Sequence, residues 1–314
     1  MGMKILLANP RGFCAGVNMA IEVVEQALKI HGPPIYVYHE IVHNRHVVEG
    51  FTGRGVSFVN SIDQIPPGQV VVYSAHGIDP DVRLQAQQRR LIEVDATCPL
   101  VTKVHLEVLR FARDGYTIVF IGHKNHDEAV GTVGESPDNI VVAESVGDVH
   151  SLQVPDPDKV AYVTQTTLSV SEAASVIEAL KLRFPKIVGP KKGDICYATT
   201  NRQSAVRELS DEADVVIVIG SRNSSNSRRL VEAAKDHGRQ AHLIDDESEL
   251  DPLWLTASDT VVVTAGASAP EHLVQALVDR LQRDYGATLE TRTLVEEKTL
   301  FELPRSLNNL AATT

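Results

Sequence analysis

An internal repeat at an offset of 98 residues is the strongest constraint on how this chain folds. When Cys98 is superposed on Cys196, residues 118–126 fall on residues 216–224 without a gap. Both stretches have the pattern of an apolar strand, a glycine turn and a polar loop, and a related stretch follows Cys14. Self-similarity of this kind indicates repeated supersecondary units. The chain is therefore predicted to contain three similar units.

Short runs of β-branched residues alternate with helical patterns along the whole chain, which predicts an α/β protein with largely parallel sheets. We expect α/β units at residues 1–98, 99–192 and 193–285, and a C-terminal extension at 286–314. Gly-Pro-Lys-Lys-Gly at 189–193 is the clearest boundary signal. Expected strands are 4–8, 35–38, 70–75, 91–95, 116–121, 140–142, 160–164, 215–219, 241–244 and 260–265. Expected helices include 17–30, 101–113, 170–184, 203–213, 227–236 and 270–285.

Composition excludes several classes of protein. The net charge of −11 argues against a broad surface for nucleic acid or an anionic membrane. No run approaches the roughly 18 apolar residues of a membrane span, and the opening residues have the pattern of a strand rather than a signal peptide. Three cysteines cannot all pair, so we expect a reducing, cytoplasmic location.

Cys14 and Cys98 follow predicted strands and Cys196 follows Gly193-Asp194, and each cysteine precedes a helical pattern, where helix N–H groups favour a thiolate. A single cysteine is most often a small buried hydrophobe. Here all three occupy equivalent points of the repeat, which favours a shared metal site. Structural zinc normally takes a fourth protein ligand, whereas an iron–sulfur cube held by three thiolates leaves one iron open. We therefore predict an iron–sulfur cluster on Cys14, Cys98 and Cys196.

Polar loops follow the strands at a repeating distance. His43, His126 and Ser224 lie 29, 28 and 28 residues after their respective cysteines. Ligands bind at the carboxyl ends of strands in open α/β sheets, so three such edges facing one axis would enclose a polar cavity. We accordingly expect a pseudo-threefold arrangement around a central cluster. Second polar strand ends lie at His76, Thr166 and Ser268, which are 62, 68 and 72 residues after the cysteines.

Hydroxyl and amide side chains open the helix expected near residue 227. Such groups cap a helix, and together with free N–H groups they also form an anion site. No P-loop and no G-x-G-x-x-G motif is present, so nucleotide binding has no support. The donors suit a diphosphate, and they are Ser224, Ser225, Asn226, Ser268, His43, His76 and His126.

Glu128 is the carboxyl best placed to deliver a proton, because it shares a loop with His126. Thr166 can orient or relay that proton through its hydroxyl. His39-Glu40-Ile41-Val42-His43 matches the zinc-protease pattern H-E-x-x-H. That chemistry needs both histidines on one helix, and here a predicted strand runs directly into His39. We therefore interpret His39 as a loop histidine rather than a zinc ligand.

Eight stretches have the pattern of motifs. They include Asn-Pro-Arg-Gly-Phe-Cys-Ala-Gly-Val at 9–17, Asp-Ala-Thr-Cys-Pro at 95–99 and Asp-Ile-Cys-Tyr-Ala-Thr-Thr-Asn-Arg at 194–202. The others lie at 43–45, 74–77, 164–169, 223–227 and 264–268. Together these stretches closely resemble the hydroxymethylbutenyl diphosphate reductases of the IspH/LytB family, and the resemblance runs from about residue 4 to residue 304.

The resemblance implies a [4Fe–4S] cluster on Cys14, Cys98 and Cys196, with one iron that no cysteine ligates and that takes the substrate's hydroxyl. It implies two-electron reductive dehydroxylation of an allylic diphosphate to isopentenyl and dimethylallyl diphosphate, with electrons from a ferredoxin or flavodoxin. Glu128 and Thr166 would handle the proton and the hydroxyl. Diphosphate or substrate binding would fall to His43, His76, His126, Thr166, Thr167, Ser224, Ser225, Asn226 and Ser268.

One residue departs from the family pattern. Asp127 stands between His126 and Glu128, where the resemblance leads us to expect proline. An added acid at this point can shift the acidity of Glu128 or loosen the loop. Two other classes stay open: a non-redox iron–sulfur dehydratase, which needs no reductant, and a non-enzymatic iron–sulfur sensor, which needs no anion donors.

Overall fold

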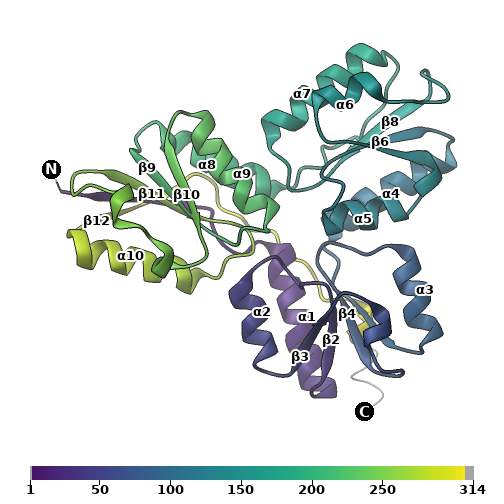
Figure 1. Ribbon diagram of the computed structural model, residues 1–314, viewed down its shortest axis with the longest axis horizontal. Helices are drawn as coiled ribbons and strands as arrows, with labels where there is room; N and C mark the ends of the chain where they lie inside the picture. The colour runs from purple at the N-terminus through teal and green to yellow at the C-terminus, as the bar shows by residue number, and fades with distance from the viewer. Residues whose placement is uncertain (1, 308–314) are drawn as a thin grey trace. The chain divides into compact units, whose positions relative to one another are not determined.

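Three all-parallel β-sheets form the framework of the chain (Figure 1). The structure is a computed structural model that describes residues 2–307. Sheet A has the order β10-β9-β11-β1-β12, sheet B the order β3-β2-β4-β5, and sheet C the order β7-β6-β8. The prediction of an α/β fold with parallel sheets is confirmed. The strands are β1 (Lys4–Asn9), β2 (Ile35–Tyr38), β3 (Val56–Val59), β4 (Val70–Tyr73), β5 (Ile92–Asp95), β6 (Thr117–Ile121), β7 (Ile140–Ala143), β8 (Val160–Thr164), β9 (Val215–Ile219), β10 (Gln240–Ile244), β11 (Thr260–Ala265) and β12 (Thr288–Thr293).

Helices connect the parallel strands, as parallel pairing requires. The α-helices are α1 (Ala15–His31), α2 (Arg45–Thr52), α3 (Pro80–Gln88), α4 (Pro99–Arg113), α5 (Asp127–Gly134), α6 (Val146–Ser151), α7 (Val170–Arg183), α8 (Tyr197–Ser210), α9 (Ser225–Asp236) and α10 (Glu271–Tyr285). Short 3₁₀ turns are η1 (Ile62–Gln64), η2 (Pro137–Asn139), η3 (Glu247–Glu249) and η4 (Pro252–Trp254).

All ten expected strands are present, within one or two residues at their ends. Two further strands, β3 and β12, were not expected. The pattern of β12, Thr-Leu-Glu-Thr-Arg-Thr, has almost no apolar residue, because it is an edge strand. Helix α8 begins at Tyr197 rather than at residue 203, the expected start. Its first turns bury polar side chains such as Thr199 and Arg202, so they carry no apolar periodicity that would reveal a helix.

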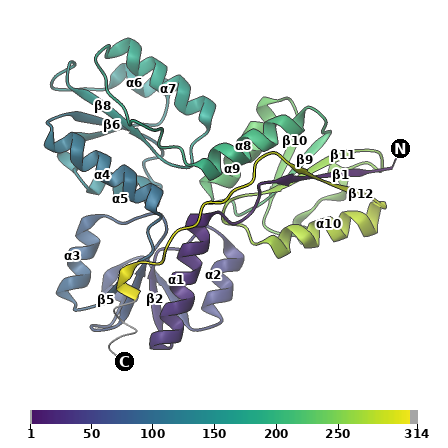
Figure 2. The same cartoon turned by 180° about the vertical axis from the view of Figure 1, so that it is seen from behind.

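The first strand does not pair with the strands that follow it. We expected the strand at residues 4–8 to belong to a unit formed by residues 1–98. Instead, β1 lies between β11 and β12, with Lys4 opposite Thr260 and Thr288 (Figure 2). The chain forms two compact units. One comprises residues 2–15, His43–Val47 and Tyr197–Leu300 and contains sheet A; the other comprises Gly16–Val42, Val48–Cys196 and 301–307 and contains sheets B and C. The other expected boundaries stay predictions, and residues 308–314 of the expected extension lie outside the described residues.

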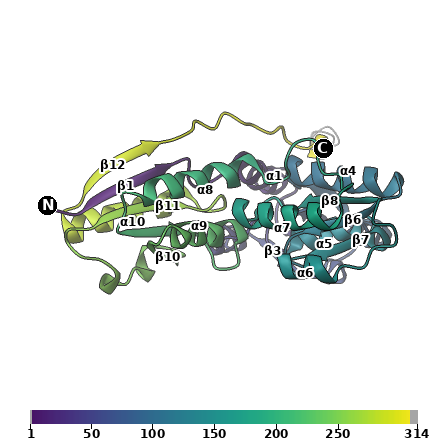
Figure 3. The same cartoon turned by 90° about the horizontal axis from the view of Figure 1, so that it is seen from above.

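Helices cover both faces of sheet A (Figure 3). Ile5 and Leu7 of β1 point toward α10, where they pack in a core with Leu277 and other apolar residues. Leu6 and Ala8 point the other way, toward α8 and α9. Because both faces are buried, the strands are nearly continuous apolar runs, as is usual in parallel sheets.

Sheet C is built in the same way as sheet A. Val119 and Ile121 of β6 pack against α6 and α7, while Ile118 and Phe120 pack against α4 and α5. In sheet B, β4 packs against α3 and η1 through Val71 and neighbouring residues. None of the helices in the described part of the chain is long and apolar enough to cross a membrane.

Candidate functional site

The order of strands is equivalent in the three sheets. In each, one strand (β2, β6 or β9) lies between the strand that follows it in sequence (β3, β7 or β10) and the next one along (β4, β8 or β11). The strand order therefore reverses between β2 and β4, between β6 and β8, and between β9 and β11. Such switch points leave a crevice outside the carboxyl ends of the two strands, where ligands bind in open α/β sheets. The two loops at each switch point carry the predicted site residues.

The first loop of each switch point brings one predicted residue to the same position. His43, His126 and Ser224 each lie five residues after the last residue of β2, β6 and β9, respectively. A helix starts at or just beyond each of them: α2, α5 and α9. The spacing between each cysteine and its polar residue therefore reflects a structural equivalence, because the three polar residues also lie at the same distance from the end of the equivalent strand in each sheet.

The cysteines also occupy one repeated position. Cys14, Cys98 and Cys196 immediately precede α1, α4 and α8. Their N–H groups donate to the carbonyl oxygens of Ala267 (3.3 Å), Ala75 (3.0 Å) and Thr166 (3.0 Å). Each acceptor lies two residues after the end of its strand, which is β11, β4 or β8. None of the three cysteines forms a disulfide bond, and all three are partly exposed.

This pattern refines the equivalence of the second loops. His76, Thr167 and Ser268 are the residues that directly follow the three acceptor carbonyls. The sequence analysis aligned Thr166, not Thr167, with His76 and Ser268. The spacing from the cysteines could not detect this shift of one residue, because the connections between strand and cysteine differ in length.

At the switch point of sheet C, Glu128 and Thr166 are joined by two hydrogen bonds. The Glu128 side chain is on the first turn of α5 and only 1% of the residue is exposed. Its Oε1 accepts the Thr166 N–H at 2.6 Å, and its Oε2 accepts the Thr166 hydroxyl at 3.0 Å. Burial raises the pKa of Glu128 from 4.5 to about 7. The two hydrogen bonds from Thr166 lower this pKa, and the charge of Asp194 raises it by a smaller amount.

Two neighbours complete this edge of sheet C. His126 caps α5, with its Nδ1 accepting the Glu128 N–H at 3.1 Å. A neutral ring that accepts at Nδ1 carries its proton on Nε2, which is then available as a donor. Gln165, which the sequence analysis did not single out, is fully buried and donates from Nε2 to the Thr167 hydroxyl at 3.0 Å. This edge therefore combines a protonatable carboxyl with oriented hydroxyl and imidazole groups.

The switch point of sheet A gathers hydroxyl and amide groups. Asn226 accepts the Ala267 N–H at 2.6 Å through Oδ1 and donates from Nδ2 to the Ser224 hydroxyl at 2.8 Å. The Ser268 hydroxyl donates to the His43 carbonyl oxygen at 2.9 Å. Ser224, Ser225 and Ser268 are all buried at the start of a helix or beside it. These are the groups that an anion needs at a helix N-terminus.

Close packing explains a glycine at this edge. A Cβ on Gly266 would lie 1.9 Å from the Ser227 hydroxyl and 2.8 Å from Asn226 Oδ1. A side chain there would displace the residues that orient Ser224. The backbone of β11 can therefore approach α9 only because residue 266 is glycine.

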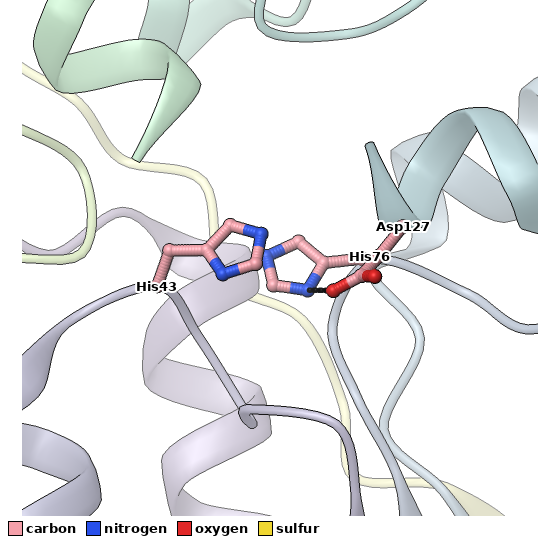
Figure 4. Close-up of side chains that lie close together, drawn as sticks. All are labelled: His43, His76 and Asp127. Carbon is pink, nitrogen blue, oxygen red and sulfur yellow. Dashed lines mark ion pairs between the residues drawn. The ribbon is translucent and has the colours of Figure 1, made fainter. Parts of the chain in front are cut away.

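Asp127 joins the histidines of sheet B to α5. Its Oδ1 lies 2.8 Å from His39 Nδ1. Its Oδ2 lies 3.9 Å from His76 Nδ1, the contact drawn in Figure 4. The His76 and His126 rings meet edge to face with centroids 5.8 Å apart. His39 has a φ of 59° and begins a turn directly after β2, so residues 39–43 are not helical. This confirms the interpretation of His39 as a loop residue, because H-E-x-x-H zinc binding requires a helix.

The fold and the site together indicate the class of protein. Parallel sheets that carry cysteines and polar groups at the carboxyl ends of their strands are typical of an α/β enzyme that acts on an anionic substrate. The chain belongs to the LytB protein family, whose sequence profile matches residues 5–282. This confirms the resemblance seen in its motifs.

Relatives cover nearly the whole chain. A protein of Rhodopirellula baltica described as 4-hydroxy-3-methylbut-2-enyl diphosphate reductase is 52% identical over 310 residues, which is 99% of this chain and 97% of that protein. A protein of Actinobacillus succinogenes with the same description is 54% identical, covering 97% of this chain and 98% of its own length. The solved structure of the E-1-hydroxy-2-methyl-but-2-enyl-4-diphosphate reductase from Plasmodium falciparum has a TM-score of 0.97 and 40% identity, covering 100% of this chain and 99% of that one.

Proposed function

We propose that this chain is a 4-hydroxy-3-methylbut-2-enyl diphosphate reductase, which catalyses the last step of the non-mevalonate route to isoprenoids. The relatives described above support this activity over nearly the full length of the chain. The structural observation that carries the proposal is the buried carboxyl of Glu128, bonded to Thr166 at a switch-point edge. Such a carboxyl can hold a proton at neutral pH for transfer to a leaving hydroxyl.

The overall reaction removes one hydroxyl from the substrate. Two electrons and two protons are consumed, the allylic C–O bond breaks, and water leaves. One proton joins the departing oxygen, and the second joins carbon at either end of the allyl group. Protonation at the two ends accounts for the two products, isopentenyl and dimethylallyl diphosphate.

Cys14, Cys98 and Cys196 are the proposed ligands of a [4Fe–4S] cluster. The residues fit such a group, because none of the three is in a disulfide, each lies directly before a helix, and the backbone N–H of each donates to a carbonyl oxygen. When bound, a cluster with three protein ligands supplies electrons and one open iron that can act as a Lewis acid. A reducing cytoplasm would keep the three thiols available.

The diphosphate would be held by donors at the switch points. Ser224, Ser225, Asn226 and Ser268 provide hydroxyl, amide and helix N–H groups from sheet A. Imidazole groups would come from His43, His76 and His126, and a hydroxyl from Thr167. Fixed donors that replace water around a dianionic group orient the rest of the substrate.

Glu128 is the proposed proton donor, and Thr166 is its partner. Two hydrogen bonds from Thr166 fix the carboxyl in one orientation. The Thr166 hydroxyl can turn to the substrate's hydroxyl while its N–H keeps hold of Glu128. Electrons would come from a ferredoxin or flavodoxin, with no part for nucleic acid or a membrane.

Anaerobic purification followed by iron and sulfide analysis tests this function, together with an assay on the allylic diphosphate. We expect about four irons per chain, a spectrum that changes when the diphosphate is added, and turnover only with a reductant. Turnover without dithionite or ferredoxin would indicate a dehydratase instead. Bound iron without any diphosphate binding would indicate a sensor.

A further inference from the structure

Lys103 and Asp194 connect the two cysteine-bearing segments of one compact unit. Lys103 lies on α4, five residues after Cys98, and Asp194 lies two residues before Cys196. The Lys103 Nζ is 2.9 Å from Asp194 Oδ1. The Asp194 side chain is 0% exposed, so this ion pair has a buried carboxylate and differs from an ordinary surface salt bridge.

The lysine uses its whole donor capacity on one short segment. Besides Asp194, Nζ donates to the carbonyl oxygens of Lys192 at 2.9 Å and Gly193 at 3.2 Å. An ammonium group has three N–H donors and no acceptor. All three donors are thus spent on residues 192–194, which lead directly into Cys196.

The start of the segment packs on β8, where Gly189 lies against the Tyr162 ring, but its last residues are exposed. Gly-Pro-Lys-Lys-Gly at 189–193 has no large apolar side chain, and Lys191, Lys192 and Gly193 are exposed. A sequence of this kind is typical of a loose connection. Contacts from neighbouring elements must therefore define the path of the backbone toward Cys196.

Asp194 also reaches the end of β8. Its Oδ2 accepts the Thr164 N–H at 3.0 Å, and two residues further on the Cys196 N–H donates to the Thr166 carbonyl at 3.0 Å. The carboxylate therefore bridges α4, which begins after Cys98, and β8, whose end accepts Cys196. Glu107 on α4 lies 4.0 Å from the Lys103 ammonium and adds a second acid beside it.

We propose that Lys103 and Asp194 are positioning residues that clamp the Cys196 segment against α4 and β8 and so set the places of two of the three thiols. This inference rests on the proposed function only for the role of those thiols. The contact between Lys103 and Asp194 is present in the chain without any cluster. An experiment that disproves the positioning role can therefore be distinguished from one that disproves the proposed function.

Hydrogen exchange of the cluster-free full-length chain tests the clamp directly. Lys103→Met should speed exchange at residues 190–197, while exchange in sheet A stays unchanged. Lys191→Met is the matched control, because it removes an exposed lysine from the same segment. Wild-type exchange at residues 190–197 in Lys103→Met would overturn the proposal.

Asp194→Asn provides a second variant of the same shape. It keeps an acceptor for the Thr164 N–H but loses the charge that binds Lys103, so it should also speed exchange at residues 190–197. Lys103→Arg should restore much of the protection, because it keeps a cation beside Asp194. If Lys103→Met does not fold, unchanged exchange in Asp194→Asn would overturn the proposal by itself.

The reduction potential of the cluster-containing protein gives a second measurement, because a non-specific loss of order at residues 190–197 would not shift it in opposite directions in the two variants. Lys103→Met leaves the Asp194 charge uncompensated beside Cys196, so the potential should fall; Asp194→Asn leaves the lysine uncompensated, so the potential should rise. The double variant should lie between them. Shifts of the same sign in the two single variants would contradict a charge-paired clamp. Absence of any cluster in the wild type would refute the proposed function while leaving the exchange result valid.

Discussion

Glu128 offers the sharpest test of the proposed chemistry. Burial raises the pKa of its carboxyl from 4.5 to about 7. The shift corresponds to about 3 kcal/mol, since one pKa unit is worth about 1.4 kcal/mol. The folded chain thus binds this proton more tightly than the unfolded chain. That contribution to stability is fully present below pH 4.5 and is lost as the pH rises through about 7.

The same pKa predicts the pH dependence of turnover. A proton donor must be protonated, so kcat/KM should be highest below about pH 7 and fall above it. At one pH unit above the pKa, only about a tenth of the molecules carry the proton. The assay is kcat/KM for the diphosphate across pH 6–9 with a fixed reductant, because kcat/KM reports the pKa of groups in the substrate-free protein.

Glu128→Gln keeps the shape of the side chain but cannot donate the proton. We expect kcat to fall by about a hundred- to ten-thousand-fold, with iron content and diphosphate binding retained. The decline above neutral pH should also disappear. Glu178→Gln, an exposed change on α7, is the control and should leave both the rate and the profile unchanged. Full activity in Glu128→Gln, or an unaltered pH profile, would refute the assignment.

Three further changes test other parts of the site. Cys98→Ser should abolish bound iron and activity together, as measured by iron analysis and turnover; retained iron would exclude Cys98 as a ligand. Asn226→Ala leaves the Ala267 N–H without its acceptor, a cost in stability of about 1–3 kcal/mol. It also removes a proposed amide donor to the diphosphate, and a hydrogen bond to a charged group is worth about 1.5–3 kcal/mol, so KM for the diphosphate should rise about 10- to 100-fold with the iron content unchanged. Asp127→Asn removes the carboxylate that lies 3.9 Å from His76 Nδ1, a contact worth at most about 1 kcal/mol, so KM should change by no more than about fivefold; a fall in kcat would show instead that Asp127 acts on Glu128.

Local patterns were sufficient to predict most of the fold. Ten strands follow from β-branched runs bounded by turns, and their parallel pairing follows from the intervening helices. The position of β1 could not be predicted, because its partners are at the other end of the chain. Edge strand β12 escaped detection for a different reason, since its polar residues carry no burial signal.

The site was predictable where residues recur at nearly the same distance from a cysteine of the repeat. His43, His126 and Ser224 were found in this way, and Glu128 was found through its neighbour His126. The shift from Thr166 to Thr167 was not visible, since only backbone hydrogen bonds define it. The pairing of Lys103 with Asp194 gave no signal, because a lysine and an aspartate 91 residues apart are common in any sequence.

The position of β1 has a consequence for biosynthesis. Lys4 pairs with Thr260 and Thr288, which the ribosome adds 256 and 284 residues later. At 5–20 residues per second, the first strand waits roughly a quarter of a minute to a minute for its partners. The backbone acceptor of Cys14, Ala267, is equally late, whereas those of Cys98 and Cys196 are already made when these cysteines emerge. Assembly of the proposed cluster on all three thiols would therefore have to wait for the synthesis of residues 260–288, long after Cys14 and Cys98 are made.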